Sequence, residues 1–336
     1  MSKLCVPLCL FLIMSAACTL SAADEAMEWE TVAFTFPMKV KDEMKDVQFK
    51  VQLPKKASPD PIRGAIQQNG SFMAVAHKHN LAVFDRYDEG HDRGPSLKFL
   101  AEAAKACKRP EIEFAGAVGI GLSASGRKAA QWAGFNRERS LAVILDHSAA
   151  GGVNTEPSYD YMNLPIIPGV PMCFNETRED LYQGIDRRAC HYNWCTSAFR
   201  GYQQPCTASI YYDPKENHHK VLSREFEAVW LDEVLSLRIP NTIPVGKPYK
   251  LTPVTIQTGG LVKVDLAKDE KGRTYHDNVV IGPAQKITKS TEMNFWVPGP
   301  KTAAKYVEWV DKNGGKIKLD KGDLVNAPQF TTGVKK

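Results

Sequence analysis

Several features that would assign a function directly are missing from this chain of 336 residues. There is no C-x-x-C pair, which argues against a zinc site built on cysteine, and no G-K-[ST] sequence, which argues against a phosphate-binding P-loop. Beyond residue 23, no apolar run is long enough to cross a bilayer. The net charge of +5 is modest and the basic residues are scattered as far as a Lys-rich C-terminal end, so the composition does not indicate nucleic-acid binding.

Residues 1–23 have the pattern of a secretory signal peptide. Lys3 supplies a positive start, Leu4–Leu20 is an apolar run, and small residues precede the expected cut near Ala23. We therefore expect a secreted or periplasmic protein with no membrane span. Two alternatives stay open, namely a lipoprotein with lipidated Cys18 and a retained membrane anchor.

Of the eight cysteines, three lie in the signal peptide, which leaves five in the mature chain. Export permits disulfides, and Cys190, Cys195 and Cys206 are close enough in sequence for one pair to form among them. Because five is odd, at least one thiol stays free.

The most informative segment is Phe114–Asp146. Its first part, Phe114–Leu122, is too uniformly small or apolar for a half-exposed strand and predicts a parallel strand covered on both faces. The segment Gly121–Ser125 then breaks the run, and an amphipathic helix and a second buried strand follow. This order is typical of a nucleophile elbow, in which a serine, here Ser123, lies on a strained strand-to-helix turn between small residues.

One residue departs from the G-x-S-x-G pattern, because Ser125 stands where the second glycine is usual. Serine is small enough for the turn. The N–H of Ala124, at the positive end of the following helix, is then a candidate oxyanion donor. The competing interpretations are a Gly/Ser turn of some other α/β protein and a phosphate-binding loop.

Strands and helices alternate along the rest of the first 240 residues, as a mixed sheet ending in parallel strands requires. An edge hairpin is predicted over residues 29–53 with its turn at Lys41–Asp46. Further strands are predicted at Arg63–Gln68, Asn80–Asp85, Leu141–Leu145, Ile166–Phe174 and Thr207–Tyr212. Helices are predicted at Phe72–His79, at Pro95–Lys108 with Leu97 and Leu100 on its apolar face, over residues 181–206, and at Ser223–Arg238.

Where an elbow carries the nucleophile, the other members of a catalytic triad follow in the chain order serine, acid, histidine. The acid is expected shortly after Phe174, with Glu176 as first choice and Asp180 as second. The base is expected after the last strand, where we favour His218 over His219. A charged loop in water is the alternative for the acids, and a solvated turn or a metal clip is the alternative for the histidines.

Other polar residues follow strand ends, where open α/β sheets bind their ligands. Gly70 and Ser71 follow one predicted strand, and a backbone N–H from this loop would complete an oxyanion hole. Ser71 also fits the N-cap of the next helix. Asp146 and His147 follow another predicted strand, and we expect them to line the pocket.

The chain resembles the α/β-hydrolase superfamily, and in particular exported bacterial hydrolases related to dienelactone hydrolases and acetyl xylan esterases. The resemblance covers about Val47–Pro240 and is carried by RPEIEFAGAVGIGLSASGRKAAQWAGFNRERSLAVI and HHKVLSREFEAVWLDEVLSLRIP. It implies a mostly parallel eight-stranded sheet with helices on both faces. It also implies Ser123 as nucleophile, Ala124 as oxyanion donor, His218 as base and an acid after Phe174.

We therefore expect three parts, namely a signal peptide (1–23), an α/β-hydrolase domain (24–240) and a C-terminal β-rich extension (241–336). The extension either packs on or beside the core, which we favour, or forms a module that binds polysaccharide or covers the pocket.

The expected function is a serine esterase that acts on a carbohydrate-borne or small ester, with no cofactor, no metal and no nucleic-acid partner. A catalytically silent binding protein on the same fold is the main alternative. Metal-dependent hydrolysis through His218, His219 and Asp146 is a more distant one.

Overall fold

The computed structural model describes residues 27–55, 60–88, 94–147, 167, 169–177, 181–182, 185–186, 207–213, 221, 223–268, 274–283, 293–312 and 316–317. The predicted signal peptide, the three cysteines from Cys190 to Cys206, and Asp180, His218 and His219 lie outside these residues.

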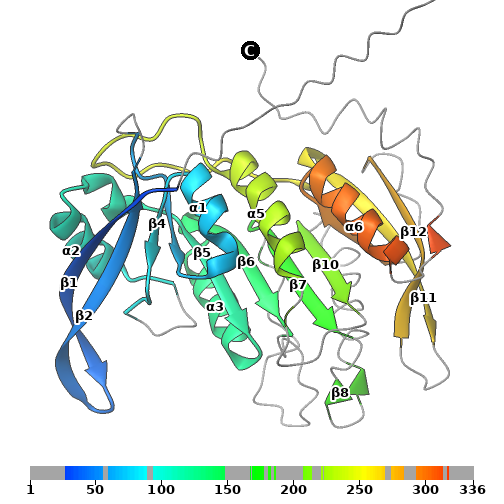
Figure 1. The fold of residues 1–336 in the computed structure, drawn as a ribbon, viewed down its shortest axis with the longest axis horizontal. Coiled ribbons are helices and arrows are strands. Elements are labelled where there is room, and N and C mark those ends of the chain that lie inside the picture. The colour runs from blue at the N-terminus through cyan, green and yellow to red at the C-terminus, as the bar shows by residue number, and fades with distance from the viewer. Residues whose placement is uncertain are drawn as a thin grey trace, which may run out of the picture.

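The core is an eight-stranded sheet with the strand order β1-β2-β4-β3-β5-β6-β7-β10 (Figure 1). The β1–β2 and β2–β4 pairs are antiparallel, and all later pairs are parallel. The strands are β1 (Trp29–Val40), β2 (Glu43–Pro54), β3 (Gly64–Gln67), β4 (Leu81–Phe84), β5 (Ala117–Leu122), β6 (Ser140–Asp146), β7 (Met172–Thr177) and β10 (Ala208–Asp213). The predicted fold class, a mostly parallel sheet that begins with an edge hairpin, is confirmed.

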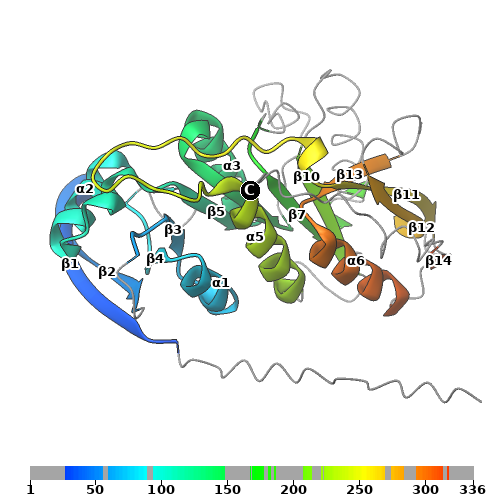
Figure 2. The same ribbon diagram turned by 90° about the horizontal axis from the view of Figure 1, so that it is seen from above.

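Helices cover both faces of this sheet, so its parallel strands are buried on both sides. Viewed from above, α1 (Met73–Lys78), α5 (Arg224–Arg238) and α6 (Pro300–Lys312) lie on one face, and α2 (Leu97–Cys107) and α3 (Ala124–Phe135) lie on the other (Figure 2). Strands β5 and β6 lie between α3 and α5, and the side chains of β6 are buried along its whole length.

The apolar face of α2 differs from the prediction. Leu100 is buried as expected, but Leu97 is 55% exposed, and Phe99 is the residue that enters the core. The Phe99 ring lies 4.9–5.4 Å, between ring centroids, from four aromatic rings of the hairpin and β4, namely Phe34, Phe36, Phe49 and Phe84. The large aromatic surface from the hairpin therefore sets the rotation of the helix.

Three further boundaries differ from those predicted. The hairpin turn consists of Lys41 and Asp42 alone, since Val40 pairs with Glu43 and Lys41 takes the positive φ of 52° that a tight turn needs. Strand β7 begins at Met172, directly after Pro171, which has no N–H to donate to a ladder. The described residues of 181–206 are strands, not helix: β8 (Leu181–Tyr182) pairs with β9 (Ile185–Asp186).

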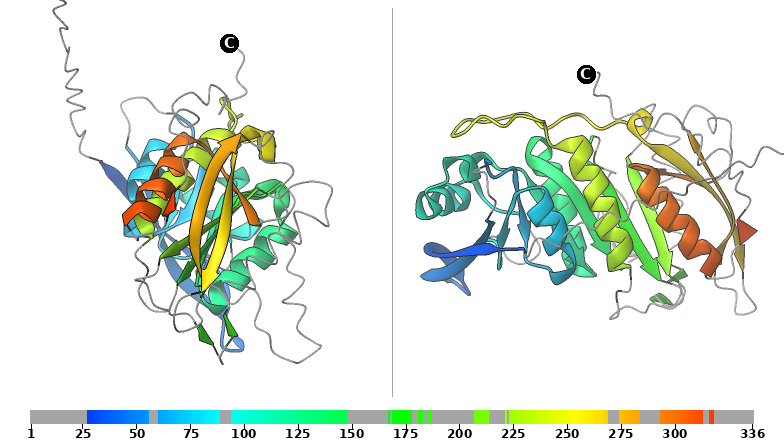
Figure 3. Two further views of the ribbon diagram at one scale, coloured as in Figure 1. Left: turned by 90° about the vertical axis from the view of Figure 1, so that its right-hand side faces the viewer. Right: turned by 45° about the horizontal axis from the view of Figure 1, so that its top comes forward.

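The C-terminal part forms a second sheet in the order β13-β11-β12-β14. Its strands are β11 (Gly260–Lys268), β12 (Thr274–Pro283), β13 (Met293–Val297) and β14 (Lys316–Ile317). The β13 end lies against β10, where the Ser209 hydroxyl donates to the carbonyl of Trp296. Helix α6 runs beside α5 (Figures 1 and 3). Among the described residues, no helix has both the length and the apolar character that crossing a membrane needs.

Helix α6 is anchored to α5 through its N-terminus. The carboxylate of Glu233 on α5 accepts hydrogen bonds from the backbone N–H groups of Lys301 (2.9 Å) and Thr302 (2.8 Å). These N–H groups have no acceptor inside their own helix, so a side chain of α5 supplies the cap that α6 lacks in its own sequence.

Replacing this cap should weaken the protein. Glu233→Ala is expected to lower the free energy of unfolding by about 1 kcal/mol, the usual cost of losing a helix cap. Glu225→Ala is the matched control, since Glu225 is on the same helix, is 77% exposed and forms only a surface pair with Lys305. Urea denaturation of both variants should show a smaller loss for Glu225→Ala, and equal losses would contradict the capping role.

Candidate active site at the carboxyl ends of β5, β6 and β7

Ser123 lies on a sharp turn between β5 and α3. Its backbone has φ 56° and ψ −126°, a conformation that residues with a side chain rarely adopt. A hydrogen bond joins the turn to the neighbouring strand β6, because the N–H of Ser123 donates to the carbonyl oxygen of Asp146 at 2.9 Å. The serine is therefore presented at the carboxyl end of a central parallel strand and at the N-terminus of a helix.

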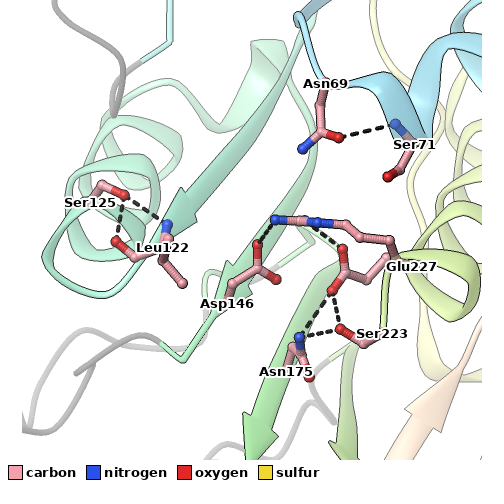
Figure 4. A network of polar contacts seen from close by, with 9 residues as sticks. Asn69, Ser71, Leu122, Ser125, Asp146, Asn175, Ser223 and Glu227 are labelled. Carbon is pink, nitrogen blue, oxygen red and sulfur yellow. Dashed lines mark hydrogen bonds and ion pairs between the residues drawn. The ribbon is translucent and has the colours of Figure 1, made fainter. Parts of the chain in front are cut away.

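A glycine before the serine makes the turn sterically possible. A Cβ on Gly121 would lie 2.4 Å from the backbone nitrogen and 2.5 Å from the Cα of Gly126, so only glycine fits at residue 121. Ser125, the departure from the usual pattern, is accommodated without conflict. Its Oγ accepts from the N–H of Leu122 at 2.7 Å and donates to the Leu122 carbonyl at 2.6 Å, which ties the two sides of the turn together (Figure 4).

The backbone N–H groups that are candidates for an oxyanion hole differ in whether they already have a hydrogen-bond acceptor. The Asn69 side chain accepts from the N–H of Ser71 at 3.1 Å (Figure 4), as a cap of the short 3₁₀ helix Gly70–Phe72. Because the N–H of Ser71 has this partner, Gly70 is the better candidate of the two. No atom lies within 4 Å of a Cβ built on Gly70, so its backbone is open to approach. Ala124 is the first residue of α3, where backbone N–H groups have no acceptor within the helix.

Asp146 and His147 lie beside the elbow, at the end of β6. Asp146 pairs in the ladder with Leu122, and His147 follows with φ 43°, its N–H donating to the carbonyl of Asn175 at 2.8 Å. Both side chains are fully buried. Their role in a pocket stays a prediction.

The other two members of the predicted triad stay predictions as well. The backbone of Glu176 lies in β7, paired with Tyr212, and so is part of the strand, not of a loop after it. Its side chain, the alternative acid Asp180, and both His218 and His219 lie outside what the structure describes.

The structure brings together a buried polar cluster that the sequence pattern did not identify. It consists of Asp146 (β6), Asn175 (β7), and Ser223, Arg224 and Glu227 at the start of α5; Figure 4 labels four of them. Nη2 of Arg224 lies 2.6 Å from Oδ2 of Asp146, and its Nη1 donates to Oε2 of Glu227 at 2.6 Å. The hydroxyl of Ser223 donates to Oε1 of Glu227 at 2.6 Å, and the amide of Asn175 donates to the same oxygen at 3.1 Å.

One signal in the sequence pointed to this cluster. Glu227 falls on the inward face of α5, between Ser223 and the buried Trp230 and Leu231. A charged residue on an apolar helix face needs a buried partner, and Arg224, one turn earlier, is in reach of it.

Burial and the nearby negative charge of Asp146 raise the pKa of Glu227 to about 8, although Arg224 acts in the opposite direction. Burial alone would lower the pKa of Arg224, but the carboxylates of Glu227 and Asp146 raise it, so this guanidinium stays charged. Burial also raises the pKa of the Cys173 thiol well above its usual value, which makes Cys173 unreactive as a nucleophile.

The sheet has this strand order, and a strained serine turn joins its central strand to the following helix. Both features together are typical of one fold. The protein has an α/β-hydrolase fold. In this fold, the turn at Ser123 lies where the nucleophile elbow is expected, and the role of Ser123 as nucleophile stays a prediction.

No family model and no curated protein matches the sequence. Among solved structures, the chain is similar to an S-formylglutathione hydrolase from Agrobacterium tumefaciens, with a TM-score of 0.40 and 13% identity, covering 62% of this chain and 94% of that one. An IroE-like serine hydrolase from Shewanella oneidensis has a TM-score of 0.43 and 10% identity, covering 63% and 82%. A bacterial heroin esterase has a TM-score of 0.39 and 12% identity, covering 63% and 86%. At these values, the similarities add nothing to what the strand order and the elbow establish.

The metal-dependent alternative needs Asp146 as a ligand. In the hydrolase fold observed, the Arg224 guanidinium lies 2.6 Å from the Asp146 carboxylate, so a cation already pairs with this carboxylate.

The elbow geometry makes a stability prediction. Gly121→Ala should lower the free energy of unfolding by about 2 kcal/mol or more, because its Cβ overlaps the Gly126 backbone. Gly134→Ala is the control, since Gly134 lies in α3 with nothing within 4 Å of a Cβ, and alanine there should raise stability by roughly 0.5–1 kcal/mol. Chemical denaturation measures both, and a Gly121→Ala variant as stable as the parent would contradict the packing described.

Proposed function

We propose that the protein is an exported serine hydrolase, a carboxylic-ester hydrolase that uses Ser123 as its nucleophile. The observation that carries this proposal is the strained backbone of Ser123, with φ 56°. Such strain costs free energy of the order of 1–3 kcal/mol and persists where the surrounding structure and a function require it. A plain Gly/Ser turn has glycine available for a positive φ and does not need a serine there.

The reaction that we propose is acyl transfer through a covalent intermediate. His218 takes the proton from Ser123 as the hydroxyl attacks an ester carbonyl, and Glu176 orients the imidazole. The N–H groups of Ala124 and Gly70 hold the oxyanion, and His218 then returns the proton to the leaving alcohol. Water cleaves the acyl-enzyme by the same route, again with His218 as base.

For the substrate, we propose a small ester or an ester carried on a carbohydrate, as the resemblance to dienelactone hydrolases and acetyl xylan esterases implies. The signal-peptide pattern of residues 1–23 supports an activity outside the cytoplasm, where polysaccharide esters are accessible to a secreted or periplasmic enzyme. A panel of acetylated sugars and aryl esters separates these two substrate groups.

The direct test is labelling with a fluorophosphonate probe, which reacts with activated serines. We expect an adduct on Ser123, located by mass spectrometry, that is absent in Ser123→Ala. Ser125→Gly, which restores the usual glycine, should still be labelled, because the turn needs only a small residue at that position. A folded protein that takes no label would reject the hydrolase and favour the catalytically silent binding protein.

The choice of base makes a separate prediction. His218→Ala should slow labelling by roughly a thousandfold or more, since removing a triad histidine costs about as much as removing the whole triad. His219→Ala, its neighbour in the same segment, should stay within about tenfold of the parent, as expected for a residue outside the proton path. Rates from stopped time courses decide between them, and the opposite order would assign the base to His219.

A further inference from the structure

The buried cluster around Arg224 connects the segments that the proposed reaction uses. Asp146 accepts the N–H of Ser123 through its backbone, so one end of the cluster is joined to the elbow. Arg224 also lies over the ring of Phe72, 5.6 Å from its centroid, and Phe72 ends the 3₁₀ helix that starts with Gly70.

The cluster reaches the remaining two segments through Asn175 and Ser223. Asn175 in β7 directly precedes Glu176 in sequence, and its amide donates to Glu227. Ser223 and Arg224 begin α5, a short way after the candidate base His218 along the chain. We call Gly70–Phe72 the oxyanion loop. The elbow, the oxyanion loop, β7 and the start of α5 therefore all contact this one cluster.

The charges within the cluster do not balance when both of its carboxyl groups are ionised. Asp146 and Glu227 are both fully buried, and they face a single guanidinium, that of Arg224. If both carboxyl groups were ionised, one negative charge would be left uncompensated in the protein interior, which is costly. Oδ2 of Asp146 has its ion pair with Nη2 of Arg224 at 2.6 Å, and Oε2 of Glu227 has its own with Nη1 of the same guanidinium at 2.6 Å. A proton on Glu227 removes the uncompensated charge, in agreement with the raised pKa of this acid.

The titratable groups that face Glu227 are few within the described part of the chain. They are Asp146 from β6, Arg224 from α5 itself and Cys173 from β7, whose thiol stays neutral.

The charged side chains of the neighbouring helices are paired elsewhere on α5. Lys78 and His79 of α1 contact Asp232, and Lys305 of α6 contacts Glu225. None of these cations therefore compensates the negative charge that Glu227 gains when it loses its proton.

We propose that Arg224 and Glu227 are positioning residues of the candidate active site, and that they hold the elbow, the oxyanion loop and the start of α5 in register only while Glu227 and Asp146 share one proton. This inference rests on the proposed hydrolase function. When the proton leaves to solvent, the two carboxylates repel each other, and the contacts of Arg224 with both of them and with Phe72 cannot all be kept. The consequence is a loss of reactivity at Ser123 on the alkaline side.

The test is the pH dependence of fluorophosphonate labelling at Ser123. In the parent protein, the labelling rate should fall with a midpoint near the Glu227 pKa of about 8. Glu227→Gln mimics the protonated acid and cannot ionise, so its alkaline fall should move upward by about one pH unit or more. Glu225→Gln, on the exposed side of the same helix, should keep the parent profile.

A purely structural role for Glu227 predicts a different result. Glu227→Gln would then change the unfolding free energy but leave the alkaline midpoint where it is in the parent. An unchanged midpoint in a folded Glu227→Gln variant overturns the inference.

Two further measurements cover the case in which Glu227→Gln does not fold. Asp146→Asn leaves one carboxyl group for one guanidinium, so the alkaline fall near pH 8 should again be absent. In the parent protein, infrared difference spectra should show a protonated carboxyl band at neutral pH that disappears in step with the labelling rate. A parent without this band overturns the inference.

Failure of the inference and failure of the proposed function give different results. If the parent takes no label at any pH, Ser123 is not an activated nucleophile, and the positioning role fails with the hydrolase proposal. If the parent is labelled but the midpoint does not respond to Glu227→Gln, only the role of the cluster is wrong.

Discussion

The close approach of two backbone segments at the elbow is the constraint on which the candidate site depends. Gly121 must lie directly against Gly126, since any side chain at residue 121 would overlap that backbone. This contact forces Ser123 into its positive-φ turn and brings its N–H to the carbonyl of Asp146. From there, the parallel pairing of β5 with β6 and of β6 with β7 determines which residues lie beside the serine. A parallel sheet brings the ends of neighbouring strands to one edge, and the candidate site lies at that edge.

Helix α5 has two roles that use different parts of its length. At its start, Arg224 pairs with Glu227 and with Asp146, a type of contact that contributes little net stability because desolvation offsets the Coulomb attraction. Further along, Glu233 caps α6 and joins the C-terminal part to the core, while Trp230 donates to Ser209 at the edge of the sheet. A partly buried arginine with two carboxyl partners fixes the positions of the segments that carry them more than it stabilises the fold. Through Asp146, this arginine is joined to the turn that carries the candidate nucleophile.

Much of the fold was predictable because hydrophobic periodicity reports burial directly. The strand before the elbow, the inward face of α3 and the order of the later strands agree with the pattern in the sequence. The errors occurred where a local pattern competed with a tertiary contact. Leu97 fits a helical apolar stripe, yet Phe99 occupies the core because aromatic rings of the hairpin lie against it. The segments Leu181–Tyr182 and Ile185–Asp186 also differ from the predicted helix, because they pair with each other as strands.

The sequence alone determined that a small-residue turn carrying Ser123 follows a buried strand, because the steric need for glycine and small neighbours is local and leaves a readable pattern. It could not determine that Asp146 and Glu227 pair with the same guanidinium, that of Arg224, since the two acids are far apart along the chain. Their meeting depends on the neighbouring positions of β6 and α5 in the folded sheet. The same holds for the partner of Ser71, because whether an N–H is available depends on how the Asn69 side chain turns in three dimensions. Local steric requirements can be read from the sequence. The balance of charges in a buried site depends on which residues packing brings together and on the exclusion of water from them.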